Sequence, residues 1–149
     1  MIPHNEATVR IENMTEICAF LQNLKDALQH GARITFQETR RVDERKDVRF
    51  TNMFTVADLF PDEDPVSALR RELSQLTAEE YMRTVRDLRF PARNDMREFG
   101  GVYSGMGEVY IKIRVELLGD DGAHSTFVMS FHYAETPFAG EMFPYKDGG

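Results

Sequence analysis

The sequence predicts an α+β fold, in which two or three helices pack on a mainly antiparallel β-sheet. Two segments near the C-terminus, 108–117 and 127–132, alternate between apolar and polar residues. A period of two is typical of strands with one face on a core. The intervening segment, 118–124, is rich in turn residues, so the pair is predicted to form a β-hairpin. Apolar residues that recur at helical spacing after Asn13 and after Asp64 supply the helices.

Composition favours a single domain spanning residues 1–149, with irregular tails at 1–12 and 134–149. The chain has 149 residues, is 42% hydrophobic and has a formal net charge of −7. A single cysteine excludes internal disulfides, and no apolar run is long enough to cross a membrane. The first residues lack the pattern of a secretory signal, so we expect a cytoplasmic protein with no membrane partner.

The first helix is expected to begin after Asn13, because Glu16 three residues on completes a capping-box pattern, and to stop at Gly31. Cys18 lies beside its apolar stripe and is interpreted as a packed small side chain rather than a nucleophile. A strand at 33–39 follows.

The polar segment 40–47 reads as a solvated loop, and 48–54 as a possible second strand. The next helix is expected to begin at Pro65, with Asp64 as its cap. A second capping box in 77–80 predicts a short helix over 78–88.

The glycine-rich segment 93–107 is interpreted as a flexible loop with a brief strand at 101–103. Its glycines match no phosphate-binding motif. The tail 134–149 is expected to be irregular, with three aromatic residues packing back on the domain: Phe138, Phe143 and Tyr145.

The hairpin is the part of the chain on which a site can be predicted. Its apolar residues are expected to face the core: Val109, Ile111, Ile113, Val115 and Leu117 on one strand, and Phe127, Met129 and Phe131 on the other. The polar residues then share the outer surface: Tyr110, Lys112, Arg114, Ser130 and His132.

These residue types suit RNA cleavage without a metal, which needs a base, an acid and cations that stabilise charge on phosphorus. His132 could be the acid or the base, because imidazole titrates near neutrality. Lys112, Arg114 and Arg83 could stabilise charge, and Tyr110 could orient a phosphate or stack on a base. Taken singly, each has an ordinary explanation as a solvated or packing side chain, so the hypothesis depends on their common face.

Three motifs resemble, in the same order, those of the MqsR family, the motility quorum-sensing regulator toxins of bacterial toxin–antitoxin pairs. They are Leu76–Thr84, Val109–Ile113 and Val128–His132. The family combines a Leu-Ser/Thr-x-x-Asp/Glu-aromatic-x-Lys helix, a Tyr-x-Lys strand and a final Ser-Phe-Lys strand. The resemblance implies a RelE/barnase-like mRNA interferase fold, metal-independent endoribonuclease activity on single-stranded RNA, and neutralisation by a protein antitoxin.

Carried over by position, the resemblance implies catalytic roles for Arg83, Tyr110 and His132. Arg83 and His132 stand where the family has lysine; arginine keeps the charge but does not readily give up a proton. The family's Trp-Gln-Asp-Val-Tyr segment has no clear counterpart in this chain, which lacks tryptophan. Four further residues are expected to bind substrate: Lys112, Arg114, Arg97 and Ser130. No metal or other cofactor is expected.

An alternative is a non-enzymatic interaction protein on the same scaffold, such as an inhibitor or adaptor. The net charge of −7 and the two substituted positions favour this interpretation. An acidic surface could mimic nucleic acid or bind a basic protein partner.

Overall fold

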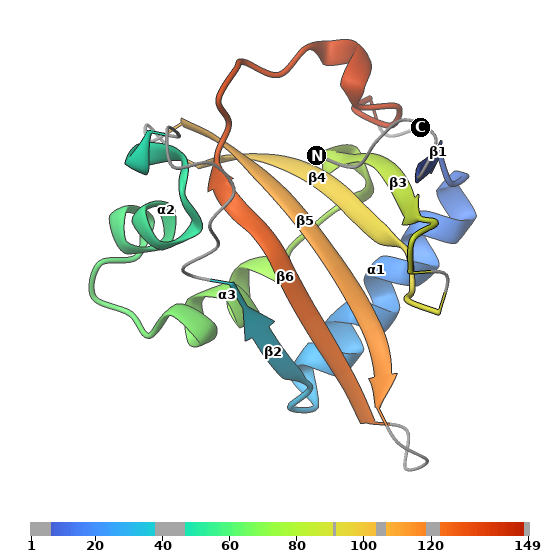
Figure 1. Cartoon of the computed structure of the whole chain (residues 1–149), viewed down its shortest axis with the longest axis horizontal. Coiled ribbons are helices and arrows are strands. Elements are labelled where there is room, and N and C mark those ends of the chain that lie inside the picture. Colours follow the sequence, from blue (N-terminus) through green and yellow to red (C-terminus); the bar gives the residue numbers. More distant parts are fainter. Residues whose placement is uncertain (1–6, 38–46, 91, 104–106, 119–122, 148–149) are drawn as a thin grey trace.

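The structure is a computed structural model that describes residues 7–37, 47–90, 92–103, 107–118 and 123–147. It confirms the α+β class: three α-helices accompany a six-stranded sheet with the order β1-β3-β4-β5-β6-β2 (Figure 1). The helices are α1 (Met14–Gln29), α2 (Asn52–Leu59) and α3 (Pro65–Leu73). The strands are β1 (Ala7–Arg10), β2 (Arg33–Phe36), β3 (Tyr81–Asp87), β4 (Met96–Tyr103), β5 (Gly107–Leu118) and β6 (Ala123–Tyr133). All neighbours are antiparallel except β2, which runs parallel to β6.

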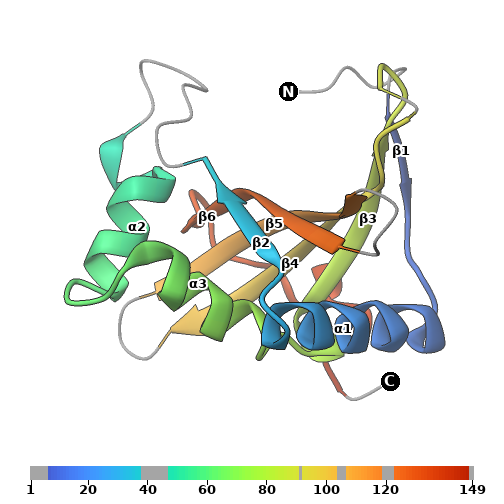
Figure 2. The same cartoon turned by 90° about the horizontal axis from the view of Figure 1, so that it is seen from below.

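The sheet has two different faces. Helices α1 and α3 lie along one of them, the covered face (Figure 2), and their apolar side chains pack with those of the strands to form the core. The buried centre of this core includes Ile17, Leu24, Leu69, Phe99, Ile111 and Phe131. The opposite face, the open face, carries Arg83, Glu98, Tyr110, Lys112 and His132. Within the described part of the chain, every helix is too short or too polar to cross a bilayer.

The predicted starts of α1 and α3 are confirmed. Asn13 and Glu16 form the expected capping box, and the Asp64 carboxylate accepts a hydrogen bond from the Ser67 amide at 3.0 Å. The prediction for Cys18 was wrong, because its side chain is exposed. It is adjacent to the buried Ile17, and a step of one residue turns a helical side chain about 100° away from the core.

Two predictions in the N-terminal half were also wrong. Part of the expected irregular tail is the strand β1, which pairs with β3; its residues, Ala-Thr-Val-Arg, alternate between apolar and polar, but over only four positions. The expected strand at 48–54 is instead a 3₁₀ turn, Val48–Phe50, followed by α2. The Thr51 hydroxyl accepts from the Phe54 amide at 3.3 Å and so caps this helix. Most of the predicted loop 40–47, like the end of the predicted strand 33–39, lies outside the described residues.

The predicted helix at 78–88 was wrong as well. The capping box at Thr77 forms, but the helical turn ends at Glu80 and the chain continues as β3. Because β3 lies between β1 and β4, its backbone bonds to both neighbours, and this tertiary pairing overrides the local helix signal. The predicted loop 93–107 is largely the strand β4, whose Met96 and Phe99 side chains are buried.

The β5–β6 hairpin is confirmed, with one irregularity. Lys112 pairs with Ser130 and Ile113 with Val128, so Met129 is an extra residue on β6. Such a β-bulge shifts the alternation by one position. Phe127 and Met129 were predicted to face the core, and this prediction was wrong. Before the bulge, the inward position is taken by Val128, which is fully buried.

The C-terminal segment crosses the ends of the central strands (Figure 1). As predicted, its aromatic residues pack back on the domain. A Cβ atom on Gly100 would lie 2.8 Å from ring carbons of Phe138 and Phe143, so only glycine leaves room for these rings over β4. Tyr145 stacks on Tyr81 at a ring-centroid distance of 6.3 Å.

Candidate active site on the open sheet face

Strand register gathers the predicted polar residues into two neighbouring rows on the open face. One row crosses four strands and contains Arg83, Glu98, Lys112 and Ser130 in order. The next row contains Tyr110 and, directly opposite on β6, His132. Residues in register on neighbouring strands point to the same side of a sheet. The common face predicted for Tyr110, Lys112, Ser130 and His132 is therefore confirmed as a geometric relationship.

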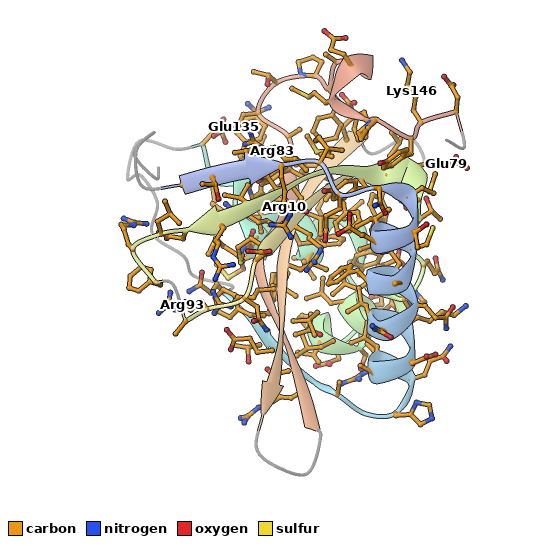
Figure 3. The ribbon with its side chains drawn as sticks, turned by 90° about the vertical axis from the view of Figure 1, so that its right-hand side faces the viewer. Arg10, Glu79, Arg83, Arg93, Glu135 and Lys146 are labelled. Carbon is orange, nitrogen blue, oxygen red and sulfur yellow. The ribbon has the colours of Figure 1, made fainter. Side chains whose placement is uncertain are left out.

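These rows line a hollow of about 740 Å³. Its polar lining includes Arg83, Glu98, Tyr110, Lys112, Ser130 and His132, together with Glu135 and Glu141. Its apolar lining includes Ile11, Met82, Phe138 and Met142, so the C-terminal segment forms part of the wall. Figure 3 shows Arg83 and Glu135 at the end of the sheet that this segment crosses.

Tyr110 and His132 are in direct ring contact. Their ring centroids are 5.5 Å apart with the planes tilted by 44°. The His132 Nδ1 atom lies 2.9 Å from the Tyr133 carbonyl oxygen, which can only accept a hydrogen bond. The neutral imidazole therefore carries its proton on Nδ1 and has its lone pair on Nε2. This arrangement assigns proton exchange to Nε2.

Arg83 is held by an acidic residue that sequence reasoning missed. Its Nε atom donates to the Glu98 Oε1 atom at 3.0 Å, and Glu98 is only 2% exposed. The sequence carries little signal for this role: Glu98 follows another charged residue, Arg97, so the segment does not alternate between apolar and polar residues, and the nearby glycines favoured a loop. The result is an oriented guanidinium beside a carboxylate, both lining the hollow.

Helix α2 fixes the strand that carries His132. The Asn52 side chain donates to the carbonyl oxygen of Met129 at 2.9 Å and accepts from the Phe131 amide at 3.0 Å. The Thr55 hydroxyl accepts from the Tyr133 amide at 2.9 Å. Strand β2 pairs with β6 only as far as Val128, and these side-chain bonds take the place of a neighbouring strand beyond that residue. They satisfy backbone groups at and after the bulge, and so hold His132 in register.

Arg97 does not join the site. It lies on the covered face, where its Nε and Nη2 atoms donate to both oxygens of the Glu12 carboxylate at 2.7 and 2.9 Å. Its guanidinium also stacks over the Phe20 ring, 4.1 Å from the centroid. The substrate-binding role predicted for Arg97 assumed a loop; on strand β4 it lies next to Glu98 and points to the opposite face.

Burial raises the pKa of Glu12, but hydrogen bonds from Arg97 and Thr84 outweigh this effect and hold that pKa below its ordinary value. The ion pair between Arg97 and Glu12 therefore belongs to the core rather than to the hollow.

Arg114 is on the open face but beside the main hollow. Its guanidinium lies over the Phe127 ring, 4.8 Å from the centroid, and its Nε atom is 2.7 Å from a Glu116 oxygen. It lines an adjoining hollow of about 270 Å³ that shares Lys112 with the main one. Arg114 therefore neighbours the other predicted residues without facing the same space.

The motif Leu76–Thr84 differs in conformation from the helix that the family resemblance implied, since it spans a 3₁₀ turn and the start of β3. Among the described side chains, no three His, Cys, Asp or Glu residues gather where they could hold a metal ion. Comparisons of the chain with protein-family models, curated proteins and solved structures found no match.

Proposed function

We propose that this protein is a metal-independent endoribonuclease that cleaves single-stranded RNA. The observation that carries the proposal is the pairing of Tyr110 with His132 beside Lys112, in a hollow that Arg83 and Glu98 also line. An acid–base group, a phenol, two cations and a carboxylate meet there. These are the groups that phosphodiester cleavage needs when no metal takes part.

The proposed reaction is attack by the ribose 2′-oxygen on the adjacent phosphorus. The bond from phosphorus to the 2′-oxygen forms, and the bond to the 5′-oxygen of the next nucleotide breaks. A base accepts the 2′-hydroxyl proton, and an acid gives a proton to the leaving 5′-oxygen. The products are a 2′,3′-cyclic phosphate and a 5′-hydroxyl end.

Lys112 stands between the two proton-transfer groups in this proposal. Its cross-strand neighbour on β4 is Glu98, while His132 is on β6 on its other side. A phosphate bound over Lys112 and Tyr110 would have the Glu98 carboxylate on one side as base and the imidazole on the other as acid. Arg83, oriented by Glu98, adds positive charge where negative charge develops.

The biological setting that we propose is a toxin of a toxin–antitoxin system, restrained by a protein antitoxin. This part of the proposal rests on the three sequence motifs that resemble the MqsR family. A small adjacent gene for a helix-turn-helix protein would support it.

The test is incubation of the purified protein with single-stranded RNA in EDTA. We expect cleavage by the wild-type protein, and a loss of about 100-fold or more in His132→Ala, because general acid–base catalysis contributes about that much. Tyr110→Phe should also be impaired. His30→Ala, which removes an exposed histidine from the end of α1, should cleave at the wild-type rate.

All four proteins are to be purified by the same route. Equal cleavage by the wild-type and His132→Ala proteins would identify a contaminating nuclease, and intact RNA at high protein concentration would refute the proposal.

A second candidate, an acidic binding module, is favoured by one feature of the same hollow. Three carboxylates line it, those of Glu98, Glu135 and Glu141, and its apolar wall includes the exposed residues Ile11 and Met142. Such a lining suits a basic, amphipathic protein segment. Recovery of a stable protein partner from a lysate, together with no nuclease activity after the partner is stripped away, would support this candidate over the first.

A further inference from the structure

Four cations and one carboxylate line the smaller hollow beside the proposed active site. The cations are Arg89, Arg93, Arg114 and Lys112, and the carboxylate is Asp87. The main hollow has the opposite balance, with two cations and three carboxylates. In a chain with a net charge of −7, the positive charge on the open face is therefore concentrated next to the proposed reaction centre rather than in it.

An exposed aromatic ring accompanies these cations. Phe90, in the turn between β3 and β4, is 43% exposed. The guanidinium of Arg93 lies 4.1 Å from its ring centroid and that of Arg89 lies at 5.6 Å. Figure 3 shows Arg93 on the side of the sheet away from α1, which is the side of the open face. A flat apolar ring among guanidinium groups is the combination that binds single-stranded nucleic acid by stacking and charge.

The two hollows adjoin at Lys112, which lines both. Arg114 lies two residues further along β5 on the same face, a step of roughly 7 Å in an extended strand. One nucleotide can span such a step. A chain with one phosphate over Lys112 would therefore bring its next phosphate to Arg114 and its next base towards Phe90.

We infer that this smaller hollow is a subsite for a nucleotide flanking the cleaved bond, and that the substrate is an RNA strand long enough to fill both hollows. The inference rests on the proposed function, since it takes the main hollow as the place of cleavage. The net-negative main hollow binds phosphate weakly by itself. Affinity comes from the cationic subsite, so a dinucleotide is a poor substrate and a longer strand a good one.

The experiment measures binding of two labelled probes by fluorescence anisotropy: a heptameric RNA and a dinucleotide, both with 2′-O-methyl groups so that neither can be cleaved. We expect the heptamer to bind the wild-type protein about tenfold or more tightly than the dinucleotide, since base stacking on Phe90 and phosphate contacts both add affinity. Arg93→Ala should remove most of this advantage and leave the dinucleotide affinity unchanged. The slope of log Kd against log salt should change by about 0.7 for the lost phosphate contact.

Two further variants separate stacking and charge from general damage. Phe90→Ala should weaken heptamer binding about fivefold or more, while Phe90→Trp should retain it, because stacking needs only an aromatic face. Arg33→Ala removes an exposed arginine from β2, at the opposite edge of the sheet, and should bind as the wild type does. Competition by polyglutamate as effective as that by RNA would indicate a site for any polyanion and would overturn the inference.

Cleavage of the unmodified heptamer by the same proteins distinguishes this inference from the proposed function. His132-dependent cleavage with a wild-type KM in Arg93→Ala would refute the subsite and leave the endoribonuclease standing. Weaker binding by Arg93→Ala with the RNA left intact would support RNA binding in the smaller hollow, but it would refute the endoribonuclease and with it a place for this hollow beside a cleaved bond. Failure of the wild-type protein to bind the heptamer would refute both.

Discussion

Tyr110 and His132 occupy directly opposed positions on β5 and β6, with their ring centroids 5.5 Å apart. Backbone pairing within a sheet, rather than a loop, sets their relative position. Groups placed on rigid elements keep their geometry more closely than groups placed on loops. The proposed chemistry depends on this rigidity, because the phenol and the imidazole must act on the same phosphate.

The first prediction concerns the base. Glu98→Gln keeps the shape of the side chain but removes the carboxylate that faces Lys112 and holds Arg83. We expect kcat to fall about 100-fold or more, because a general base is lost. Glu79→Gln, at an exposed position in the preceding 3₁₀ turn, should leave the rate unchanged. A wild-type kcat for Glu98→Gln would assign the base to another residue.

The second prediction concerns the buried amide of Asn52. Asn52→Leu leaves the carbonyl of Met129 and the amide of Phe131 without their side-chain partner. Each unsatisfied buried group costs roughly 1–3 kcal/mol, so the free energy of unfolding should fall by about 2 kcal/mol or more in urea denaturation. RNA cleavage should fall too, since the same strand carries His132.

Met53→Leu, at an exposed position on the same helix, is the matched control and should change neither quantity. Full stability and activity in Asn52→Leu would mean that the bulge needs no support from α2.

The third prediction separates Arg97 from the site. Arg97→Met leaves the Glu12 carboxylate, which is 4% exposed, without its bidentate partner. Breaking a buried pair costs about 3 kcal/mol or more, so the variant should be strongly destabilised in urea. At urea concentrations below its unfolding transition, the Arg97→Met variant should bind RNA as the wild type does. A normal free energy of unfolding combined with weaker RNA binding would return Arg97 to the substrate site.

The same pair gives the protein a pH dependence of known sign. Burial raises the pKa of Glu12, but its hydrogen bonds lower that pKa by a larger amount. In the folded state the pKa therefore lies below the ordinary value of 4.5. The ionised Glu12 carboxylate therefore stabilises the folded state fully at pH values above its ordinary pKa. This stabilisation is lost as the pH falls through the lower pKa that Glu12 has in the folded state. In urea denaturation, the difference in free energy of unfolding between the wild type and Glu12→Gln should shrink below about pH 4.5. A difference that grows on acidification would contradict the direction of the shift.

The fourth prediction concerns the contact between β4 and the C-terminal segment. Gly100→Ala places a Cβ atom 2.8 Å from the rings of Phe138 and Phe143 and should displace them. Overpacking of this kind costs about 1–3 kcal/mol of stability. The double variant Gly100→Ala/Phe138→Ala should be less unstable than the sum of its single variants, because removing one ring makes room for the methyl group. Strict additivity in thermal unfolding would show that the segment does not rest on Gly100.

Sequence patterns predicted those parts of the fold in which local signals and tertiary structure agree. The N-terminal caps and apolar stripes identified α1 and α3, and the alternation around Ile111 identified the hairpin with Tyr110 and His132 on one face. Elements that form mainly through pairing with distant strands could not be read in this way. Strand β3 follows a genuine capping box, and β1 is a four-residue strand whose short alternation, Ala-Thr-Val-Arg, is a weak signal on its own.

The errors at the site have the same origin. A single extra residue, Met129, reversed the expected faces of Phe127 and Val128, and no residue type marks such a bulge in advance. Glu98 was missed and Arg97 was wrongly placed at the substrate site for the same reason: interpreting β4 as a loop left out the alternation of strand faces that puts the two side chains on opposite sides of the sheet. The polar face of a hairpin can be predicted from local pattern, whereas the strands that flank it depend on the whole sheet.

Chemical analysis of the RNA ends tests the central claim most directly. Cleavage of a single-stranded RNA in EDTA, followed by mass spectrometry, should reveal 2′,3′-cyclic phosphate and 5′-hydroxyl ends, and a 2′-deoxy substitution at the cleaved position should block the reaction. Products with 5′-phosphate ends, or cleavage of the 2′-deoxy substrate at the same rate, would contradict a reaction in which the groups around Tyr110 and His132 activate the 2′-hydroxyl.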